Sequence, residues 1–191
     1  ETSETKIAVT LRLDGQGIVD VETGIGMLDH MLSQLGKHGG FDLIVRAQGD
    51  LSVDAHHTVE DIGLALGQAV NKALHNRSGI ARMADRTVAL DESLVQVVID
   101  LSGRPYAVLG LEFSGEMAGG LPTAMVSHFL HSFAQEAKLT LHVRQLAGDN
   151  DHHIAEATFK ALARTLRDAV KIIEEDPTSI PSTKGTLGPL N

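Results

Sequence analysis

A short motif that occurs twice is the part of this sequence whose residue types best suit chemistry. The two copies are His56-His57-Thr58-Val59-Glu60 and His152-His153-Ile154-Ala155-Glu156, and each follows an Asp-rich turn. If each copy opens a helix, its first histidine and its glutamate stand four residues apart and project from one face. An imidazole and a carboxylate on one face are typical metal ligands, so the two copies predict two divalent metal ions.

The paired histidines favour metal binding over a plain helix start. A glutamate in the first helical turn is stabilised by the helix dipole, but a potential cation gains nothing there. Adjacent residues on a helix diverge by about 100°, so neighbouring histidines cannot easily serve one metal. We therefore expect two half-sites, each made of a histidine and a glutamate four residues apart: His56 with Glu60, and His152 with Glu156. The second histidines, His57 and His153, are then expected to reach the opposite metal in a crossed arrangement.

The duplication extends upstream of the motif. Leu28-Asp29-His30-Met31-Leu32 is similar to Val126-Ser127-His128-Phe129-Leu130, and a strand-like segment follows each, at residues 41–46 and 138–144. The order histidine, strand, motif recurs at an offset of 96 to 98 residues. A repeat of about half the chain length that is present only twice indicates an internally doubled domain. His30 and His128 would complete the two ligand sets, and three histidines with one carboxylate suit manganese, iron, zinc or cobalt.

Hydrophobic periodicity predicts strands and helices in both halves. We expect strands over residues 6–13, 17–22, 42–47, 87–89, 94–101, 106–113 and 139–144, and helices over 24–37, 57–75, 122–136 and 152 to about 175. Asp14-Gly15 and Gly103-Arg104-Pro105 are turn signals, so we expect each to join its two neighbouring strands as a hairpin. The pattern predicts an α+β domain, with two packed sheets or one continuous sheet and helices to one side.

The length predicts a single domain over residues 1–191, made of two repeats at about 1–84 and 85–175 and followed by an arm at 176–191. Three Pro and two Gly make the arm irregular, so a ligand or a neighbour is needed to order it. Ser182-Thr183-Lys184-Gly185 in that arm, and Arg104 on its Gly-Arg-Pro turn, are donor types that bind a phosphate.

The composition excludes several classes of function. The sequence has no Cys, which leaves nitrogen and oxygen donors as metal ligands. A formal net charge of -9 argues against nucleic-acid binding, and one Tyr, five Phe and no Trp offer no platform for stacked bases. No window is apolar enough for a membrane helix, and residues 1–13 lack the features of a signal peptide. We therefore expect a cytoplasmic protein, or a plastid protein whose transit peptide has been removed.

Taken together, the motifs resemble those of the imidazoleglycerol-phosphate dehydratase family, the lyases of histidine biosynthesis. The matching stretches are TGIGMLDHM (23–31), DAHHTVED (54–61), DLSGRPY (100–106), NDHHIAEATFK (150–160) and PSTKG (181–185), and the resemblance runs from about residue 4 to 188. It implies a duplicated half-domain of the ribosomal S5 domain 2-like type. It also implies a homo-oligomer of about 24 subunits, with di-manganese sites at the subunit interfaces. Met27 departs from the family pattern, which usually has Phe there.

The resemblance also implies which residues bind the substrate. Its phosphate is assigned to Arg82, Arg104, Lys160, Ser182 and Lys184, with Gln34 and His38 as additions. An arm that the substrate orders would also close the site against water. Proton transfer needs a carboxylate near the substrate's side chain, and Glu156 and Glu4 are the candidates between which the sequence does not choose.

The implied reaction removes water from D-erythro-imidazole-glycerol phosphate and yields imidazole-acetol phosphate. The lost C–H is not next to a carbonyl, so direct proton abstraction is very slow. Two divalent ions, expected to be Mn²⁺, would stabilise the ring of the substrate as an imidazolate. The imidazolate expels hydroxide to give a diazafulvene, whose neighbouring C–H is acidic, and the enol that follows becomes the ketone.

Two other functions fit part of the sequence. A di-metal phosphate-ester hydrolase also needs two metals and several cations, but its bridging water usually calls for more carboxylates than these half-sites offer. A metal-storage protein has no need of the arginines or of the Ser-Thr-Lys segment. Release of inorganic phosphate would favour the first, and stoichiometric metal without turnover would favour the second.

Overall fold

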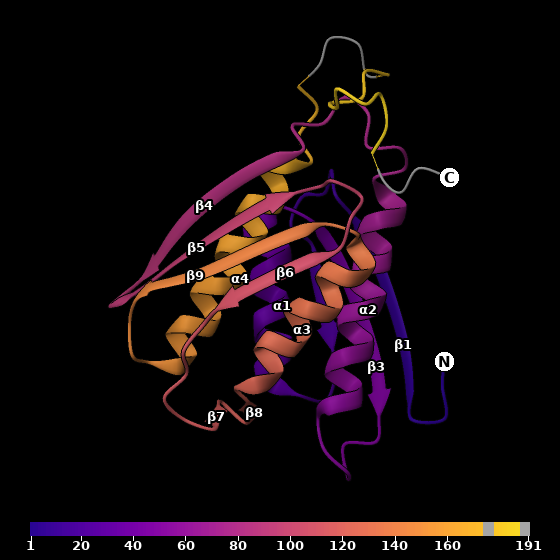
Figure 1. Ribbon diagram of the computed structural model, residues 1–191. Helices are drawn as coiled ribbons and strands as arrows, with labels where there is room; N and C mark the ends of the chain where they lie inside the picture. Colours follow the sequence, from indigo (N-terminus) through magenta and orange to yellow (C-terminus); the bar gives the residue numbers. More distant parts are fainter. Residues whose placement is uncertain (174–177, 188–191) are drawn as a thin grey trace.

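The computed structural model describes residues 1–173 and 178–187, in which two main sheets surround four helices (Figure 1). In chain order the elements are β1 (Thr5–Arg12), β2 (Val19–Glu22), α1 (Gly26–Gly39), β3 (Asp42–Gly49), α2 (His56–Ala73), β4 (Met83–Leu90), β5 (Ser93–Asp100), β6 (Tyr106–Gly110), β7 (Met117–Ala118), β8 (Leu121–Pro122), α3 (Ala124–Ala137), β9 (Thr140–Ala147) and α4 (Asp151–Ala169). One main sheet has the strand order β1-β3-β2, and the other has β4-β5-β9-β6. The predicted α+β class is confirmed.

The helices lie between the two main sheets. α1 and α2 pack on the three-stranded sheet, and α3 and α4 pack on the four-stranded one. α1 also packs against α4, and α2 against α3. Strand alternation explains this arrangement: in β3, Leu43 and Val45 are buried, whereas Ile44 and Arg46 point outward and are exposed. Helices cover one side of each sheet, as predicted, but it is the helices and not the sheets that meet in the middle.

Both predicted hairpins are wrong, and for the same reason. β3 lies between β1 and β2, antiparallel to the first and parallel to the second. β9 likewise lies between β5 and β6. The Asp42 carboxylate at the start of β3 accepts hydrogen bonds from the backbone N–H groups of Gln16 and Ile18, at 2.8 and 3.0 Å, and so holds the wide turn open around the inserted strand. A turn signal marks where the chain reverses, but a strand that returns later decides the pairing.

The two main sheets share one plan. The strands β5-β9-β6 repeat the order and directions of β1-β3-β2, and β4 is added at one edge. In both halves a helix follows the second of these strands and another follows the inserted one. The division into repeats near residue 84, just after β4 begins, stays a prediction.

Helix boundaries follow local sequence signals only in part. α1 ends where the Gly pair predicts, with Gly40 in the left-handed conformation at φ 69°. Pro122 does not open a helix: it lies in the short strand β8, and α3 begins at Ala124. Proline is compatible with a strand end as well as with a helix start, so its presence does not decide between them. None of the described helices is long and apolar enough to cross a bilayer.

The last helix is shorter than predicted. α4 ends at Ala169 and not near Glu175, which itself lies outside the described residues. The backbone after α4 instead pairs with the segment before β4, where Ile172 forms an antiparallel bridge to Ile80. Tertiary pairing therefore replaces the last helical turns that the sequence favours.

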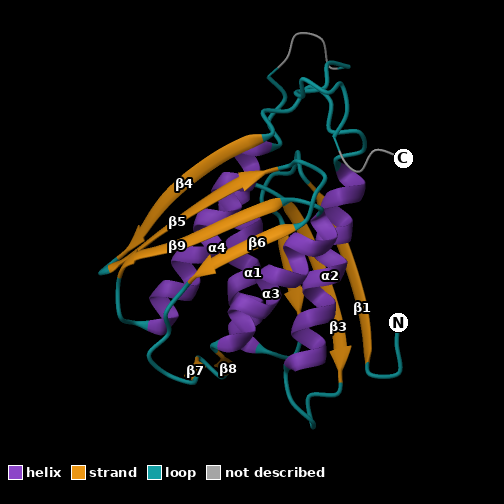
Figure 2. Cartoon of the chain, viewed as in Figure 1, coloured by secondary structure: helices purple, strands orange, loops and turns teal. Residues whose placement is uncertain are grey.

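The described part of the predicted arm, residues 178–187, forms neither helix nor strand, in agreement with the prediction (Figure 2). Residues 176, 177 and 188–191 of that arm lie outside the described residues. The arm and the N-terminal ends of α2, α3 and α4 lie at opposite ends of the molecule (Figure 1). The two repeated motifs, which open α2 and α4, are therefore remote from the arm of their own chain.

Candidate metal centre

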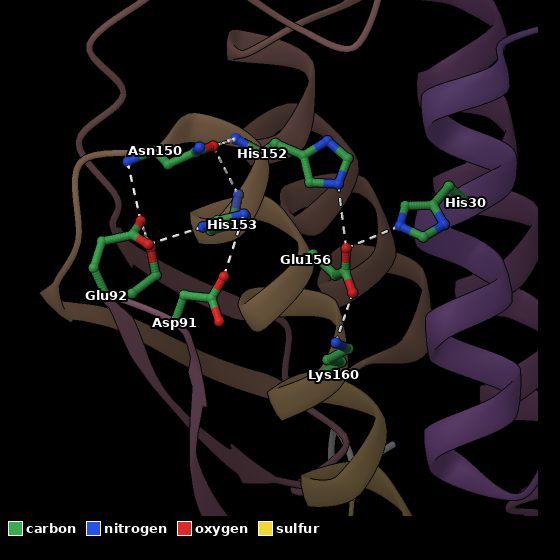
Figure 3. Close-up of polar contacts among 9 residues, drawn as sticks. His30, Asp91, Glu92, Asn150, His152, His153, Glu156 and Lys160 are labelled. Carbon is green, nitrogen blue, oxygen red and sulfur yellow. Dashed lines mark hydrogen bonds and ion pairs between the residues drawn. The ribbon is translucent and has the colours of Figure 1, made fainter.

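One triad of potential ligands forms where α4 packs against α1. His152 and Glu156 lie one turn apart on α4, and His30 projects toward them from α1 (Figure 3). The Glu156 Oε2 atom is 2.9 Å from His30 Nε2 and 3.2 Å from His152 Nε2. α4 starts here because the Asn150 side chain caps it, accepting hydrogen bonds from the backbone N–H groups of His152 and His153 at 3.0 and 3.3 Å. We call His30, His152 and Glu156 the first triad.

A second triad forms where α2 packs against α3. His56 Nε2 on α2 is 3.5 Å from Glu60 Oε2, and His128 Nε2 on α3 is 3.3 Å from the same oxygen. The ring centroids of His56 and His128 are 4.4 Å apart. His128 Nε2 is buried and makes no hydrogen bond, so it is an atom that a metal ion would satisfy. We call His56, Glu60 and His128 the second triad.

Each triad combines the two halves of the chain. The structure keeps together the histidine and glutamate of each motif that stand four residues apart, as expected. His30 joins the motif of the second half, and His128 joins the motif of the first half. Each half therefore contributes a histidine to the triad of the other half, through the helix pairs α1–α4 and α2–α3. The second histidines of the motifs belong to neither triad within the chain.

His57 and His153 lie outside both triads and contact other carboxylates. His57 Nδ1 is 3.0 Å from Asp50 Oδ2, and His153 Nδ1 is 2.9 Å from Glu92 Oε2. These hydrogen bonds raise the pKa of both histidines above 6.5, and the bond from His153 is the main cause that lowers the pKa of Glu92 to about 2. Sequence reasoning missed both carboxylates. Asp50 stands 7 residues before its histidine and offered a weak signal, whereas Glu92 stands 61 residues away and offered none.

The two triads fit divalent metal ions. In each triad the three ligand atoms lie within 4.8 Å of one another. Two imidazole nitrogens and one carboxylate oxygen suit borderline ions such as manganese, iron or zinc, and they leave positions open for further ligands. Asp91, Glu92 and His153 meet the same distance limit, but Asp91 is 76% exposed and His153 Nδ1 is engaged by Glu92. The first and second triads are therefore the better candidates.

Lys160 sets the electrostatics of the first triad. Its Nζ atom lies 2.6 Å from Glu156 Oε1, one turn further along α4 (Figure 3). Burial opposes ionisation of Glu156, but hydrogen bonds from Lys160 and His30 outweigh it and lower the pKa of Glu156 to about 2. Glu156 is therefore a carboxylate at neutral pH, which is the form that binds a metal ion.

The residues expected to bind the phosphate fall into two groups, of which the first adjoins the first triad. Gln34 and His38 follow His30 at one-turn intervals on α1, and Lys160 follows the triad on α4. His38 Nε2 is 3.0 Å from Gln34 Oε1. Burial lowers the pKa of His38, and the charges of Lys160 and Arg164 lower it further, so His38 lies within a cationic surrounding that favours an anion.

The second group is Arg82, Arg104, Ser182 and Lys184, of which Ser182 and Lys184 lie in the arm and Arg82 contacts it. Arg82 binds both carboxylate oxygens of Asp100, at 2.7 and 3.0 Å, and donates to the Pro181 carbonyl at 2.7 Å. Arg104 and Lys184 are exposed. Among the described residues no hydrogen bond or ion pair joins this group to the first one. That the two groups bind one phosphate together stays a prediction.

Glu4, the other candidate for proton transfer, lies just before β1 and beside His57. Its Oε2 atom is 3.7 Å from His57 Nδ1, and its side chain is 52% exposed. Glu156 instead belongs to the first triad. The two candidates are thus placed beside different histidines.

Fold and site together define the class of this protein. It is an α+β protein with two sets of two histidines and one glutamate that could each hold a metal ion, and cations lie beside one set. The family model described as imidazoleglycerol-phosphate dehydratase matches residues 23–166.

Relatives and solved structures agree with this match. Proteins named imidazoleglycerol-phosphate dehydratase from Acidothermus cellulolyticus and Dehalococcoides mccartyi are 53% and 54% identical over 187 residues, which is 98% of this chain and 90% and 94% of those proteins. The crystal structure of imidazoleglycerol-phosphate dehydratase from Staphylococcus aureus has a TM-score of 0.81 and 34% identity, and the match covers 90% of this chain and 95% of that chain. The structure from Pyrococcus furiosus in complex with (S)-C348 has a TM-score of 0.84 and 34% identity over 98% of both chains.

The chain therefore belongs to the imidazoleglycerol-phosphate dehydratase family, and it is a hydro-lyase of histidine biosynthesis. One more relative, from Arabidopsis thaliana, is named imidazoleglycerol-phosphate dehydratase 1, chloroplastic. It is 52% identical over 186 residues, which is 97% of this chain and 69% of that protein.

Proposed function

We propose that this hydro-lyase converts D-erythro-imidazole-glycerol phosphate to imidazole-acetol phosphate with one divalent metal ion in each triad. The observation that carries the proposal is a pair of similar ligand sets, each with its ligand atoms within 4.8 Å, in a chain of this family. The substrate's imidazole ring has two nitrogens, and two ligand sets match them. Manganese is the proposed ion because imidazole and carboxylate donors without a thiolate accept it.

The side chains around the triads suit the parts of this reaction. Bound divalent ions would act as Lewis acids and favour loss of the ring N–H of the substrate. Glu156 is already engaged by His30, His152 and Lys160, so the freer carboxylate for proton transfer at the substrate's side chain is Glu4. Single replacement of each glutamate by glutamine, with metal content measured, decides between them. The variant that lacks the proton-transfer residue should lose orders of magnitude in kcat while the protein keeps its bound metal.

We also propose that the sites are completed between the subunits of a large homo-oligomer of about 24 chains. His57 and His153 would bind the metal ions of a neighbouring subunit through Nε2, which is supported by their position outside the triads of their own chain. The phosphate would be held by Gln34, His38 and Lys160 of one subunit and by the group near the arm of another. Light scattering before and after metal removal measures the assembly and its dependence on metal.

Turnover of imidazoleglycerol phosphate by manganese-loaded protein, with EDTA-stripped protein beside it, tests the proposed function. Ketone formation only in the presence of metal supports the proposal. His75→Asn, which changes an exposed histidine outside both triads, should leave turnover unchanged. Release of inorganic phosphate would support the hydrolase instead, and two bound metal ions per chain without either product would support metal storage.

The proposed location is the cytoplasm or the plastid. The name of the Arabidopsis relative supports the plastid as one of these two alternatives. Cell fractionation followed by an activity assay of each fraction distinguishes them.

A further inference from the structure

The second histidine of each motif is held in the same way. An ionised carboxylate only accepts hydrogen bonds, so Asp50 and Glu92 require the proton of their histidine to be on Nδ1. This tautomer leaves a lone pair on Nε2 of His57 and of His153, and a lone pair on an imidazole nitrogen is what a metal ion binds. His153 Nε2 lies 4.0 Å from the exposed Asp91 carboxylate. Carboxylate, histidine and metal ion in that order are a recurrent arrangement at metal sites.

The two carboxylates are not equivalent residues of the repeat. Asp50 follows Gly49 at the end of β3, in the segment that leads to α2. The matching residue of the second half is Asp149, which follows Gly148 after β9, yet it makes no hydrogen bond or ion pair among the described residues. The partner of His153 is instead Glu92, which comes from the turn between β4 and β5 (Figure 3). Because the contact is built from different elements in the two halves, duplication alone does not account for it.

Glu92 is itself fixed in place. Its Oε1 atom accepts hydrogen bonds from Ser93 Oγ at 2.8 Å and from the backbone N–H of Asn150 at 3.3 Å. Its other oxygen is then directed at His153 Nδ1. Asn150 also caps α4, so the same residue fixes both the helix that carries His153 and the carboxylate that orients it.

Asp50 is held less completely, and its arrangement has a cost. Its Oδ1 atom is buried and has no hydrogen-bond partner, while Oδ2 contacts His57. A buried carboxylate oxygen without a partner is unfavourable for folding. The contact that the structure gives the side chain of Asp50 is therefore the one from Oδ2 to His57 Nδ1, at 3.0 Å.

We propose that Asp50 and Glu92 are positioning residues that fix the tautomer and direction of His57 and His153, so that each presents Nε2 to a metal ion. The proposal rests on the proposed function, in which these two histidines are metal ligands. It adds that each ligand depends on a carboxylate of its own chain.

The affinity for manganese, measured by competition with a chelator on the full-length protein, tests the proposal. Asp50→Asn and Glu92→Gln keep the size of the side chain. They replace a carboxylate, which can only accept hydrogen bonds, by an amide that can also donate, so the histidine tautomer is no longer fixed. Each variant should therefore weaken metal binding by about 10- to 100-fold. Asp149→Asn removes the corresponding but uncoupled carboxylate and should leave the affinity unchanged. Wild-type affinity in both positioning variants would overturn the proposal, as would an equal loss in the control.

Comparison with histidine variants separates this proposal from the proposed function. His153→Ala that binds metal as the wild type does would show that the histidine is not a ligand, and both proposals would fail for that site. If His153→Ala weakens binding but Glu92→Gln does not, only the positioning role fails. In the double variant, Glu92→Gln should add nothing to the loss from His153→Ala, because Glu92 acts through that ring. Additive losses would mean that Glu92 acts elsewhere and would overturn the assignment.

A spectroscopic readout is independent of metal. Solid-state ¹⁵N NMR of histidine-labelled, metal-free protein reports which ring nitrogen carries the proton. The His153 signals, assigned by their loss in His153→Ala, should show the Nδ1–H tautomer in the wild type and lose that preference in Glu92→Gln. An unchanged tautomer in Glu92→Gln would contradict the positioning role even if metal binding were weakened.

Discussion

The two helix pairs that carry the triads are built from corresponding residues but differ in charge. Beside the first triad, α1 and α4 present Gln34, His38, Lys160 and Arg164, and the corresponding residues beside the second triad on α3 and α2 are Ser132, Glu136, Leu64 and Gln68. Glu136 is occupied by Gln68, whose side-chain amide donates to it at 3.0 Å. The second helix pair thus offers a carboxylate where the first offers a histidine and two cations. Both pairs keep a metal-type ligand set, but only the first is suited to a phosphate.

The same difference shows in the two glutamates. Glu156 is 13% exposed and paired with Lys160, whereas Glu60 is 39% exposed and has Leu64 in the place of that lysine. The lysine brings a positive charge to the first triad and keeps its glutamate ionised at low pH. The comparison indicates that ligand geometry was retained in both halves while the surroundings diverged.

Loss of the histidine that each triad takes from the opposite half should have the largest effect. His30→Ala and His128→Ala should each remove about one metal ion per chain and lower turnover by at least about 100-fold, because even outer partners of metal ligands are worth 10- to 100-fold. Elemental analysis and steady-state kinetics measure both quantities. Unchanged metal content in one variant would show that the two triads are not equivalent metal sites.

An exchange of the residues at positions 160 and 64 tests the charge difference directly. Lys160→Leu makes the first helix pair resemble the second, and it should raise the KM for the phosphorylated substrate by about 10- to 100-fold, the worth of a charged hydrogen bond. Leu64→Lys adds a cation beside the second triad and should change KM by less than about 2-fold. Metal content is measured in both variants, because Lys160 also contacts Glu156. Equal effects of the two changes would contradict an asymmetric phosphate site.

Acid should destabilise the metal-free protein partly through the first triad. The pKa of Glu156 is lowered from 4.5 to about 2 by folding, so its stabilising contribution is present above pH 4.5 and is lost as pH falls toward 2. The Glu156 carboxylate binds a proton more tightly in the unfolded chain than in the folded protein. In Glu156→Gln the free energy of unfolding should therefore depend less steeply on pH between 4.5 and 2 than in the wild type. Urea unfolding at a series of pH values measures the difference, and equal slopes for Glu156→Gln and wild type would refute it.

The smallest expected effect concerns how the helices of the two halves end. Gly40 follows the last residue of α1 and Lys138 follows the last residue of α3, and both are in the left-handed conformation, at φ 69° and 51°. A side chain costs about 1 kcal/mol in that conformation, so Gly40→Ala should lower the free energy of unfolding by about that amount and Lys138→Gly should raise it by up to about 1 kcal/mol. Denaturant unfolding of both variants measures these changes. Destabilisation by Lys138→Gly would mean that the lysine side chain makes compensating contacts.

Local signals in the sequence predicted the elements of the site well. The spacing in His-His-x-x-Glu places a histidine and a glutamate on one helical face whatever the fold, so the pairs His56–Glu60 and His152–Glu156 followed from sequence alone. The α+β class and the end of α1 at Gly40 also followed from periodicity and from glycine's freedom at positive φ.

Strand pairing did not follow, because the hydrogen-bond partners of a strand are set by distant segments. The turns after β1 and β5 reverse the chain as expected, but β3 and β9 insert between their neighbours only after a helix has carried the chain across the sheet. The Asp42 carboxylate that holds the first turn is an ordinary acidic residue until the fold places it under that turn.

The sequence by itself determined the ligand types, their spacing along each helix and the duplication of the motif, since these depend on residues within one or two turns. Only the tertiary structure decided that His30 completes the motif of the second half and His128 that of the first, because this depends on which helices pack together. It likewise decided that Asp50 and Glu92 orient the remaining histidines, the second across 61 residues of chain. Contacts between distant segments are fixed by packing, which no local pattern encodes.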